Sequence, residues 1–158
     1  MSVIKAREHL KKWGLDQNLV ETGTSTATVE LAAETLGCIP ARIAKTLSFK
    51  LTDRILLIVT AGDAKVNNGK YKAEFGAKAK MLAFEEVEDK IGHAVGGVCP
   101  FGVNEGVEVY LDESLKRFET VFPACGSESS MIELSIPQLE ICSDFLKWVD
   151  ICKGWYEE

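Results

Sequence analysis

The sequence predicts an α/β fold with a mixed curved sheet, partly barrel-like and about six to seven strands in size, and helices inserted around it. Short strand-like segments recur along the chain, and the helical segments between them do not follow a strict βαβ alternation. The length of 158 residues, with 46% hydrophobic and 27% charged, suits one ordinary globular core. We therefore expect a single domain over residues 1–158, with no repeat and no linker.

The first part of the chain predicts two helices and then a strand hairpin. Apolar spacings of three and four residues that end at a glycine indicate helices over residues 3–14 and 28–37. Side chains alternate between apolar and other types along residues 42–51, and a continuous apolar run covers residues 55–61. These are two strand patterns joined by a polar turn, so we expect them to pair.

The remaining segments are shorter. Helices are expected near residues 68–75 and over residues 85–91, with a short helix opening at Asp112. Pro137 stands at the first helical position of a last helix over residues 138–148. Strands are expected at 80–83, 107–111, 120–125 and 131–136.

Composition and charge narrow the function classes. The net charge of −6 disfavours a protein that coats DNA or RNA, and no DNA partner is expected. The N-terminus lacks a signal-peptide pattern and no run approaches the ~20 apolar residues of a membrane span, so we expect a cytoplasmic protein with no membrane partner. Five cysteines without a CxxC pair and two histidines give no metal-ligand spacing.

A local excess of lysine runs against this acidic balance. Five lysines lie between Lys65 and Lys80, against the single acid Glu74. The segment could contact a few phosphates, although a solvated helix face is the commoner reason for such lysines.

Lys45 is the first candidate for chemistry. It shares the alternating face of its strand with the apolar Ile43, Leu47 and Phe49, so the pattern predicts a partly buried amine. A buried ammonium is costly unless it is paired or its pKa falls, and such groups concentrate at functional sites. The alternative is an edge strand whose lysine reaches the surface beside Arg42.

A glycine-rich loop over residues 92–102 is the second candidate. Glycines let the backbone approach a ligand closely and present N–H groups to an oxygen atom, and a proline would hold the loop rigid. Neither the Walker spacing nor GxGxxG at a helix start is present, so a nucleotide fingerprint is excluded and a structural turn stays open. The loop contains Gly92, Gly96, Gly97, Pro100 and Gly102.

Other polar residues are weaker candidates. His93 has no visible partner for general-base work, and Cys99 would need a base to become a nucleophile. Asp112 ends a strand and begins a helix, so it suits a cap as well as a site. Ser127 and Ser129 follow Gly126 in a turn, where serine is common in any case.

Five segments in order resemble the YbaK/ProX (YbaK/EbsC) family of aminoacyl-tRNA deacylases, which is related to the editing domain of bacterial prolyl-tRNA synthetases. Their number and spacing make the resemblance specific, and it covers roughly residues 26–139. The segments are TVELAAETLG at 28–37, IAKTL at 43–47, GGVCPFG at 96–102, YLDESL at 110–115, and GS at 126–127 before IELS at 132–135.

The resemblance implies hydrolysis, in trans and without a cofactor or metal, of the ester in mischarged tRNA, commonly tRNA-Pro. It implies that activity depends on Lys45 and that the loop from Gly96 to Pro100 positions the aminoacyl group. The acceptor end of aminoacyl-tRNA is the implied partner, and an aminoacyl-tRNA synthetase is a further candidate. The substrate-binding residues that we expect are Gly96, Gly97, Val98, Cys99, Pro100, Phe101, Gly102, Asp112, Gly126 and Ser127.

Two other functions stay open at this point. One is a non-catalytic module that binds a tRNA end or a nucleotide and associates with a synthetase. The other is a small-molecule hydrolase that uses Cys99. The polar run at residues 21–26, where the family forms part of its amino-acid pocket, does not define a specificity.

Overall fold

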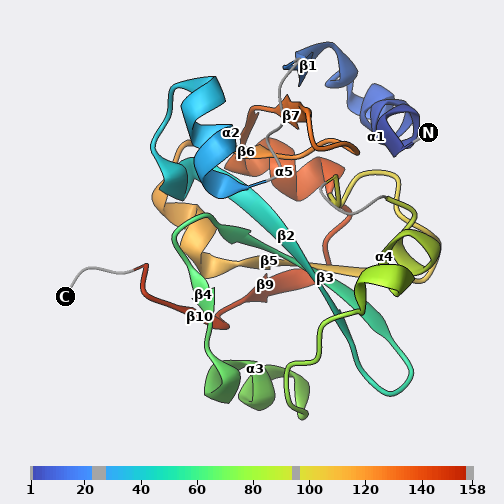
Figure 1. The fold of residues 1–158 in the computed structure, drawn as a ribbon, viewed down its shortest axis with the longest axis vertical. Helices are drawn as coiled ribbons and strands as arrows, with labels where there is room; N and C mark the ends of the chain where they lie inside the picture. Colours follow the sequence, from blue (N-terminus) through green and yellow to red (C-terminus); the bar gives the residue numbers. More distant parts are fainter. Residues whose placement is uncertain (1, 23–27, 94–96, 156–158) are drawn as a thin grey trace.

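A computed structural model describes residues 2–22, 28–93 and 97–155 of the chain (Figure 1). Its centre is a curled, mixed sheet of six strands in the order β8-β6-β2-β3-β5-β9. The mixed α/β fold predicted from the sequence is therefore confirmed. The strands of this sheet are β2 (Ile43–Lys50), β3 (Ile55–Ala61), β5 (Glu108–Asp112), β6 (Thr120–Pro123), β8 (Leu134–Ser135) and β9 (Lys147–Val149).

Helices and two small sheets surround this centre. The α-helices are α1 (Ser2–Leu10), α2 (Val29–Leu36), α3 (Asn68–Phe75), α4 (Phe84–Ile91) and α5 (Ile136–Cys142). The 3-10 helices are η1 (Lys11–Trp13), η2 (Asp16–Asn18), η3 (Pro40–Arg42) and η4 (Glu113–Arg117). The two small sheets pair β1 (Leu19–Glu21) with β7 (Ser130–Ile132), and β4 (Lys65–Val66) with β10 (Cys152–Lys153).

The β2–β3 hairpin forms the middle of the main sheet. The two strands are antiparallel, with Lys45 opposite Thr60 and Leu47 opposite Ile58. β3 then pairs in parallel with β5, and β2 in parallel with β6, which makes the sheet mixed. The predicted hairpin is confirmed, and its continuous apolar run is buried from Leu56 to the end of β3.

A chain of aromatic rings fixes α3 on one face of the hairpin. The ring centroids of Phe49 and Tyr71 lie 5.0 Å apart, those of Tyr71 and Phe75 4.8 Å, and those of Phe75 and Tyr110 5.1 Å. Each such pair contributes about 0.5–1.5 kcal/mol beyond the area that it buries. The face of β2 that carries Phe49 therefore packs against α3 and is called the α3 face. The opposite face is called the α4 face.

Two of the local predictions were wrong. The expected helix over 138–148 ends at Cys142, Asp144 takes a left-handed φ of 54°, and Trp148 then lies in β9 opposite Leu111. Pairing with β5 thus outweighs the helical pattern there. The expected strand at 80–83 is reduced to a single bridge between Met81 and Phe49.

Within residues 2–22, 28–93 and 97–155, no helix is both long enough and apolar enough to cross a membrane.

Candidate functional site

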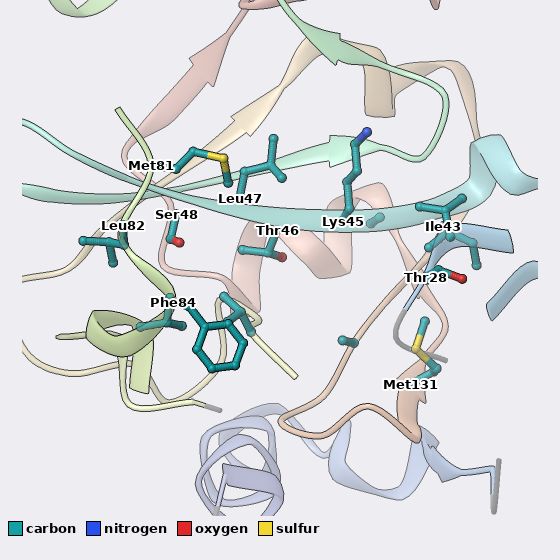
Figure 2. Close-up of a pocket in the computed structure, with 15 residues that line it drawn as sticks. Thr28, Ile43, Lys45, Thr46, Leu47, Ser48, Met81, Leu82, Phe84 and Met131 are labelled. Atoms are coloured by element: carbon teal, nitrogen blue, oxygen red, sulfur yellow. The ribbon is translucent and has the colours of Figure 1, made fainter. Parts of the chain in front are cut away.

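A cavity of about 480 Å³ lies along β2 and is the main candidate for a ligand site (Figure 2). Its volume falls within the range of small-molecule pockets, roughly 300–1,000 Å³. The walls combine β2 with the start of α2, the chain from Met81 into α4, the glycine loop, the end of β6 and strand β7. The lining residues are Thr28, Val29, Ile43, Ala44, Lys45, Thr46, Leu47, Ser48, Met81, Leu82, Phe84, Val87, Val98, Ala124 and Met131.

The edge of β2 beside this cavity lacks a partner strand in its middle. β6 pairs with β2 only at Ile43 and Ala44. At the other end, the Ser48 carbonyl accepts a hydrogen bond from the Leu82 N–H at 3.2 Å. In a β-strand, the backbone N–H and C=O of every second residue point to the same edge. Because the Ser48 carbonyl points to this edge, the N–H and C=O of Thr46 point to it as well. In the described parts of the chain, no strand covers residues 45–47 there.

The Lys45 side chain is half-buried and projects from the α3 face of β2. Figure 2 shows Lys45 and Leu47 on one side of the strand, with Thr46, Ser48 and Phe84 on the other. The predicted alternation is therefore confirmed. β2 lies between β6 and β3 in the sheet, so the alternative of an edge strand holds only locally, at the uncovered residues 45–47. Lys45 lines the cavity, but its ammonium group lies across β2 from the Phe84 ring.

The surroundings of Lys45 disfavour its charged form. Burial lowers the pKa of the Lys45 ammonium below the usual value of a lysine, and this is the largest influence. Cys152 and Asp63 act against it and raise this pKa, Lys65 lowers it, and Glu30 raises it. Among the residues with described positions, none forms an ion pair with Lys45. A free cation in such a place is suited to binding an anionic or carbonyl oxygen.

Asp63 is held by a different cation. Arg117 donates from Nη1 to Asp63 Oδ2 at 2.9 Å and from Nη2 to Asp63 Oδ1 at 2.5 Å, which is a two-point contact. Asp63 follows the end of β3, and Thr60 of that strand lies opposite Lys45. The carboxylate that raises the Lys45 pKa is thus paired with Arg117.

The glycine loop and the Gly126–Ser127 turn meet in space. The Gly126 N–H donates to the Gly97 carbonyl at 3.0 Å, and a Cβ atom on Gly97 would overlap backbone atoms of Gly126 and Ser127. Only glycine fits at position 97 without a shift of this turn. Val98 is the described residue of this loop that lines the cavity. Gly96, the predicted first residue of the motif, lies outside the described residues.

The rest of the loop is turned toward the interior. Cys99, Pro100 and Phe101 are buried, and Gly102 packs so closely on the Lys5 backbone that a Cβ atom would overlap it. These four predicted substrate-binding residues do not line the cavity. They anchor the loop on the core and on α1.

Cys99 and His93 are close but do not form a nucleophile pair. The Cys99 Sγ lies 3.5 Å from His93 Nε2, which also lies 2.6 Å from the Phe101 carbonyl oxygen. A carbonyl only accepts, so Nε2 carries the hydrogen and cannot take the thiol proton. Burial raises the pKa of Cys99 to about 12 and lowers that of His93. A thiol this buried and protonated is a structural residue.

Asp112 and Ser127 are engaged in local structure. Asp112 is fully buried, and its carboxylate accepts from the Ser114 N–H at 3.0 Å and from the Ile151 N–H at 2.9 Å. It therefore caps η4 and holds the C-terminal segment. The Ser127 hydroxyl is 2.6 Å from that of Ser130, within its own turn. Neither Asp112 nor Ser127 lines the cavity.

Part of the lysine-rich segment forms a second, smaller hollow. It has a volume of about 370 Å³ beside α3 and is lined by Asn68, Gly69, Lys72, Lys78 and Ala79. In the described structure, Lys72, Lys78 and Lys80 are exposed and form no ion pair, whereas Lys70 pairs with Asp150 at 3.1 Å. No group of three or more His, Cys, Asp or Glu side chains in the described ranges could hold a metal ion.

Comparison with protein families decides what kind of domain this is. The sequence model of the aminoacyl-tRNA editing domain matches residues 24–141, about three quarters of the chain. The chain belongs to the aminoacyl-tRNA editing domain family. The match includes β2, the cavity walls and the glycine loop.

Individual relatives of this editing domain agree with the assignment. The chain is 52% identical over 156 residues to the uncharacterized protein YwhH of Bacillus subtilis, covering 98% of this chain and 99% of that protein. It is 38% identical over 92 residues to the proline–tRNA ligase of Bacillus subtilis, covering 58% of this chain but 15% of the ligase. A crystal structure of a candidate trans-editing enzyme for prolyl tRNA synthetase has a TM-score of 0.87 at 27% identity, over 97% of this chain and 98% of that one.

The sequence reasoning overlooked most of the cavity wall of this editing domain. Thr46 and Ser48 alternate with Lys45 along the strand and so lie on the α4 face, where they line the cavity. The same alternation that predicts the place of Lys45 also predicts theirs. The hydroxyl of Thr46 is covered and has no hydrogen-bond partner in the described ranges. Phe84 and Met131 come from distant segments, and no local pattern marks them as neighbours of β2.

Proposed function

We propose that this chain is an aminoacyl-tRNA deacylase that removes wrongly attached amino acids from tRNA, with tRNA-Pro as its first candidate. It would act in trans, in the cytoplasm, through the domain that these 158 residues form. The family assignment and the likeness to a candidate trans-editing enzyme support this proposal. The observation that carries it is the half-buried ammonium of Lys45, which has no ion-pair partner among the described residues and lies on the strand whose open edge lines the cavity.

The proposed reaction is hydrolysis of the ester between the amino acid and the terminal ribose. Water adds to the ester carbonyl carbon, the carbonyl oxygen becomes an oxyanion, and the bond to the ribose oxygen then breaks as that oxygen takes a proton. The products are a free amino acid and a tRNA with its hydroxyl restored. The adenosine 2′-hydroxyl can assist the water, so the proposal needs no covalent nucleophile from the protein.

The protein would supply positioning and electrostatic stabilisation. Lys45 is proposed to bind the terminal phosphate or the ester carbonyl, and the Thr46 N–H at the open edge would donate to the developing oxyanion. Because the Lys45 ammonium and the Phe84 ring lie on opposite faces of β2, the ester would cross the open edge at residues 45–47. Val98 and Ala124 would bound the amino-acid side chain.

A short single-stranded RNA end is a partner that an acidic protein can bind. The net charge of −6 repels a long duplex, but Lys72, Lys78 and Lys80 are exposed on one segment. Similarity to part of a proline–tRNA ligase makes a prolyl-tRNA synthetase the proposed docking partner.

The test is deacylation of tRNA-Pro charged with alanine, cysteine or serine, with prolyl-tRNA-Pro as the correctly charged control. We expect wild-type protein to release at least one wrong amino acid, and Lys45→Ala to slow release by about 100-fold or more. Lys90→Ala removes an exposed lysine of α4 outside the cavity and should leave the rate unchanged.

Two results would refute the deacylase. If no charged tRNA is hydrolysed but the same tRNA still binds, the non-catalytic module is favoured. Full activity in Lys45→Ala would refute the role of Lys45 on which the proposal depends. Cys99→Ala should keep the wild-type rate, whereas its inactivation in a folded protein would favour the thiol hydrolase.

A further inference from the structure

Phe84 is exposed at the mouth of the cavity. Its exposed fraction is 73%, the highest of the large hydrophobic side chains described. Phe84 belongs to none of the three hydrophobic clusters found in the described ranges, although Val87 one turn later does. The ring therefore has no evident packing role in the fold.

Met81 lies at the same mouth and is exposed to 55%. Phe84 forms the apolar rim on the α4 side of the cavity, whereas Met81, which bridges Phe49, lies on the Leu47 side of β2 (Figure 2). Figure 2 shows the Phe84 ring on the Thr46 side of β2, facing the cavity rather than the core. The rim thus opens directly onto the space assigned to the substrate.

The backbone that carries Phe84 is firmly held. Glu86 Oε1 accepts from the Ala83 N–H at 3.0 Å and from Lys50 Nζ at 2.9 Å, which ties the first turn of α4 to β2. Lys50 also offsets the charge of Glu86, two residues after Phe84. A ring on a fixed backbone loses little freedom when it binds a flat ligand.

Charge around the rim selects the kind of ligand. Glu85, Glu88 and Asp89 are exposed on α4 and repel phosphate from the helix itself. Lys78 and Lys80 precede Met81 and, within the described ranges, have no ion pair. A ligand with a neutral aromatic part on Phe84 and its phosphates toward these lysines fits both conditions.

We propose that Phe84 is a stacking platform for the unpaired terminal nucleobase of the aminoacyl-tRNA. The proposal rests on the proposed function, which supplies an RNA end at this cavity. A nucleobase has an apolar face and stacks on aromatic rings, whereas its ribose and phosphates stay polar. Stacking on Phe84 would direct the terminal ribose toward the open edge of β2.

The kinetic test compares variants that keep or remove the ring. Loss of one base–aromatic contact should lower kcat/KM of Phe84→Ala by roughly 5- to 100-fold, mainly through a higher KM. Phe84→Tyr retains the ring and should stay within about twofold of the wild type. Leu146→Ala is the matched control, because Leu146 is 60% exposed but lies outside the cavity. An unchanged KM in Phe84→Ala would overturn the proposal.

A binding test works without turnover. Phe84→Trp places a fluorescent indole at the rim, and we expect adenosine 5′-monophosphate to quench it saturably while ribose 5-phosphate does not. Uncharged tRNA should quench it at lower concentration than tRNA that lacks its terminal adenosine. Equal responses to the nucleotide and to ribose 5-phosphate would overturn stacking.

The two proposals can fail separately. If the wild type hydrolyses mischarged tRNA but Phe84→Ala behaves like the wild type, the deacylase stands and the stacking platform falls. If no tRNA is hydrolysed but Phe84→Trp responds selectively to the base, the platform stands and the deacylase falls. Quenching by an apolar peptide but not by a nucleotide would assign the rim to a protein partner and overturn the proposal.

Discussion

At the residue scale, Lys45 combines partial burial with the absence of a described ion-pair partner. Burial lowers its pKa below the usual lysine value, so its protonated fraction falls earlier on the alkaline side than that of a free lysine. If the cation stabilises the transition state, activity is full below this lowered pKa and is lost as pH rises through it. Asp63 raises the Lys45 pKa, and Arg117 holds the Asp63 carboxylate through two hydrogen bonds.

Arg117→Gln should therefore weaken the reaction without touching the cavity. Asp63 would lose its partner and attract Lys45, which raises the Lys45 pKa and makes substrate compete with a carboxylate. We expect about a tenfold lower kcat/KM, which corresponds to about 1.4 kcal/mol of lost transition-state stabilisation. The alkaline limb of the pH profile should move to higher pH. The spontaneous hydrolysis of the substrate, measured without enzyme, is subtracted at each pH.

The double variant Arg117→Gln/Asp63→Asn separates this effect from a structural one. Removing the carboxylate should restore kcat/KM and return the alkaline limb toward lower pH. Arg117 also donates to the Trp155 carbonyl at 2.8 Å, so thermal unfolding of each variant checks that the C-terminal segment stays folded. Equal loss in the single and double variants would show that Asp63 does not control Lys45.

At the element scale, the contact between the glycine loop and the Gly126–Ser127 turn shapes the cavity wall. Gly97→Ala places a methyl group against backbone atoms, which cannot rotate away as a side chain can. We expect a loss of about 1–3 kcal/mol in the free energy of unfolding, measured in urea. Val98 lines the cavity beside this contact, so deacylation should fall as well.

Gly69→Ala is the matched control for that prediction. Gly69 lies inside α3, where a Cβ atom would meet only the Asn67 side chain, at 3.2 Å. Alanine is favoured over glycine within a helix by about 0.5–1 kcal/mol, so stability should be unchanged or slightly higher. A Gly97→Ala protein as stable as this control would show that the loop and the turn adjust freely.

At the scale of the whole molecule, an acidic protein must bind an anionic RNA end through a local patch. Lys72, Lys78 and Lys80 form the exposed lysine patch, and the first two line the small hollow beside α3. The triple change of these lysines to alanine should weaken tRNA binding and flatten its salt dependence, by about 0.7–0.9 in the log–log slope per lost phosphate contact. The rate at saturating tRNA should change little.

A second triple variant with the same change in net charge, made outside the patch, controls for the effect of the protein's overall charge on RNA binding. The control replaces three exposed lysines of η1 and α4, Lys11, Lys12 and Lys90. If both triple variants lose affinity equally, net charge and not the patch governs RNA binding. Filter binding at several salt concentrations distinguishes the two cases.

Local sequence patterns determined most of the elements of this fold. Apolar spacing and glycine stops predicted α1 and α2, and the alternating pattern and the continuous apolar run predicted β2 and β3. Periodicity reports which face of an element is apolar, and that is settled within a few residues. The C-terminal error arose because Trp148 pairs with Leu111, a contact between distant segments that no local pattern contains.

The same division holds for the site. The sequence alone determined that Lys45 shares an apolar strand face, that glycine is concentrated before Phe101, and that the ordered motifs resemble a deacylase family. Only the tertiary structure decided that β2 has an open edge, that Phe84 stands at the cavity mouth, and that Cys99 is sealed in the core. Those features depend on which distant strands pair and where their pairing stops, and backbone pairing of this kind leaves no periodic signal in the chain.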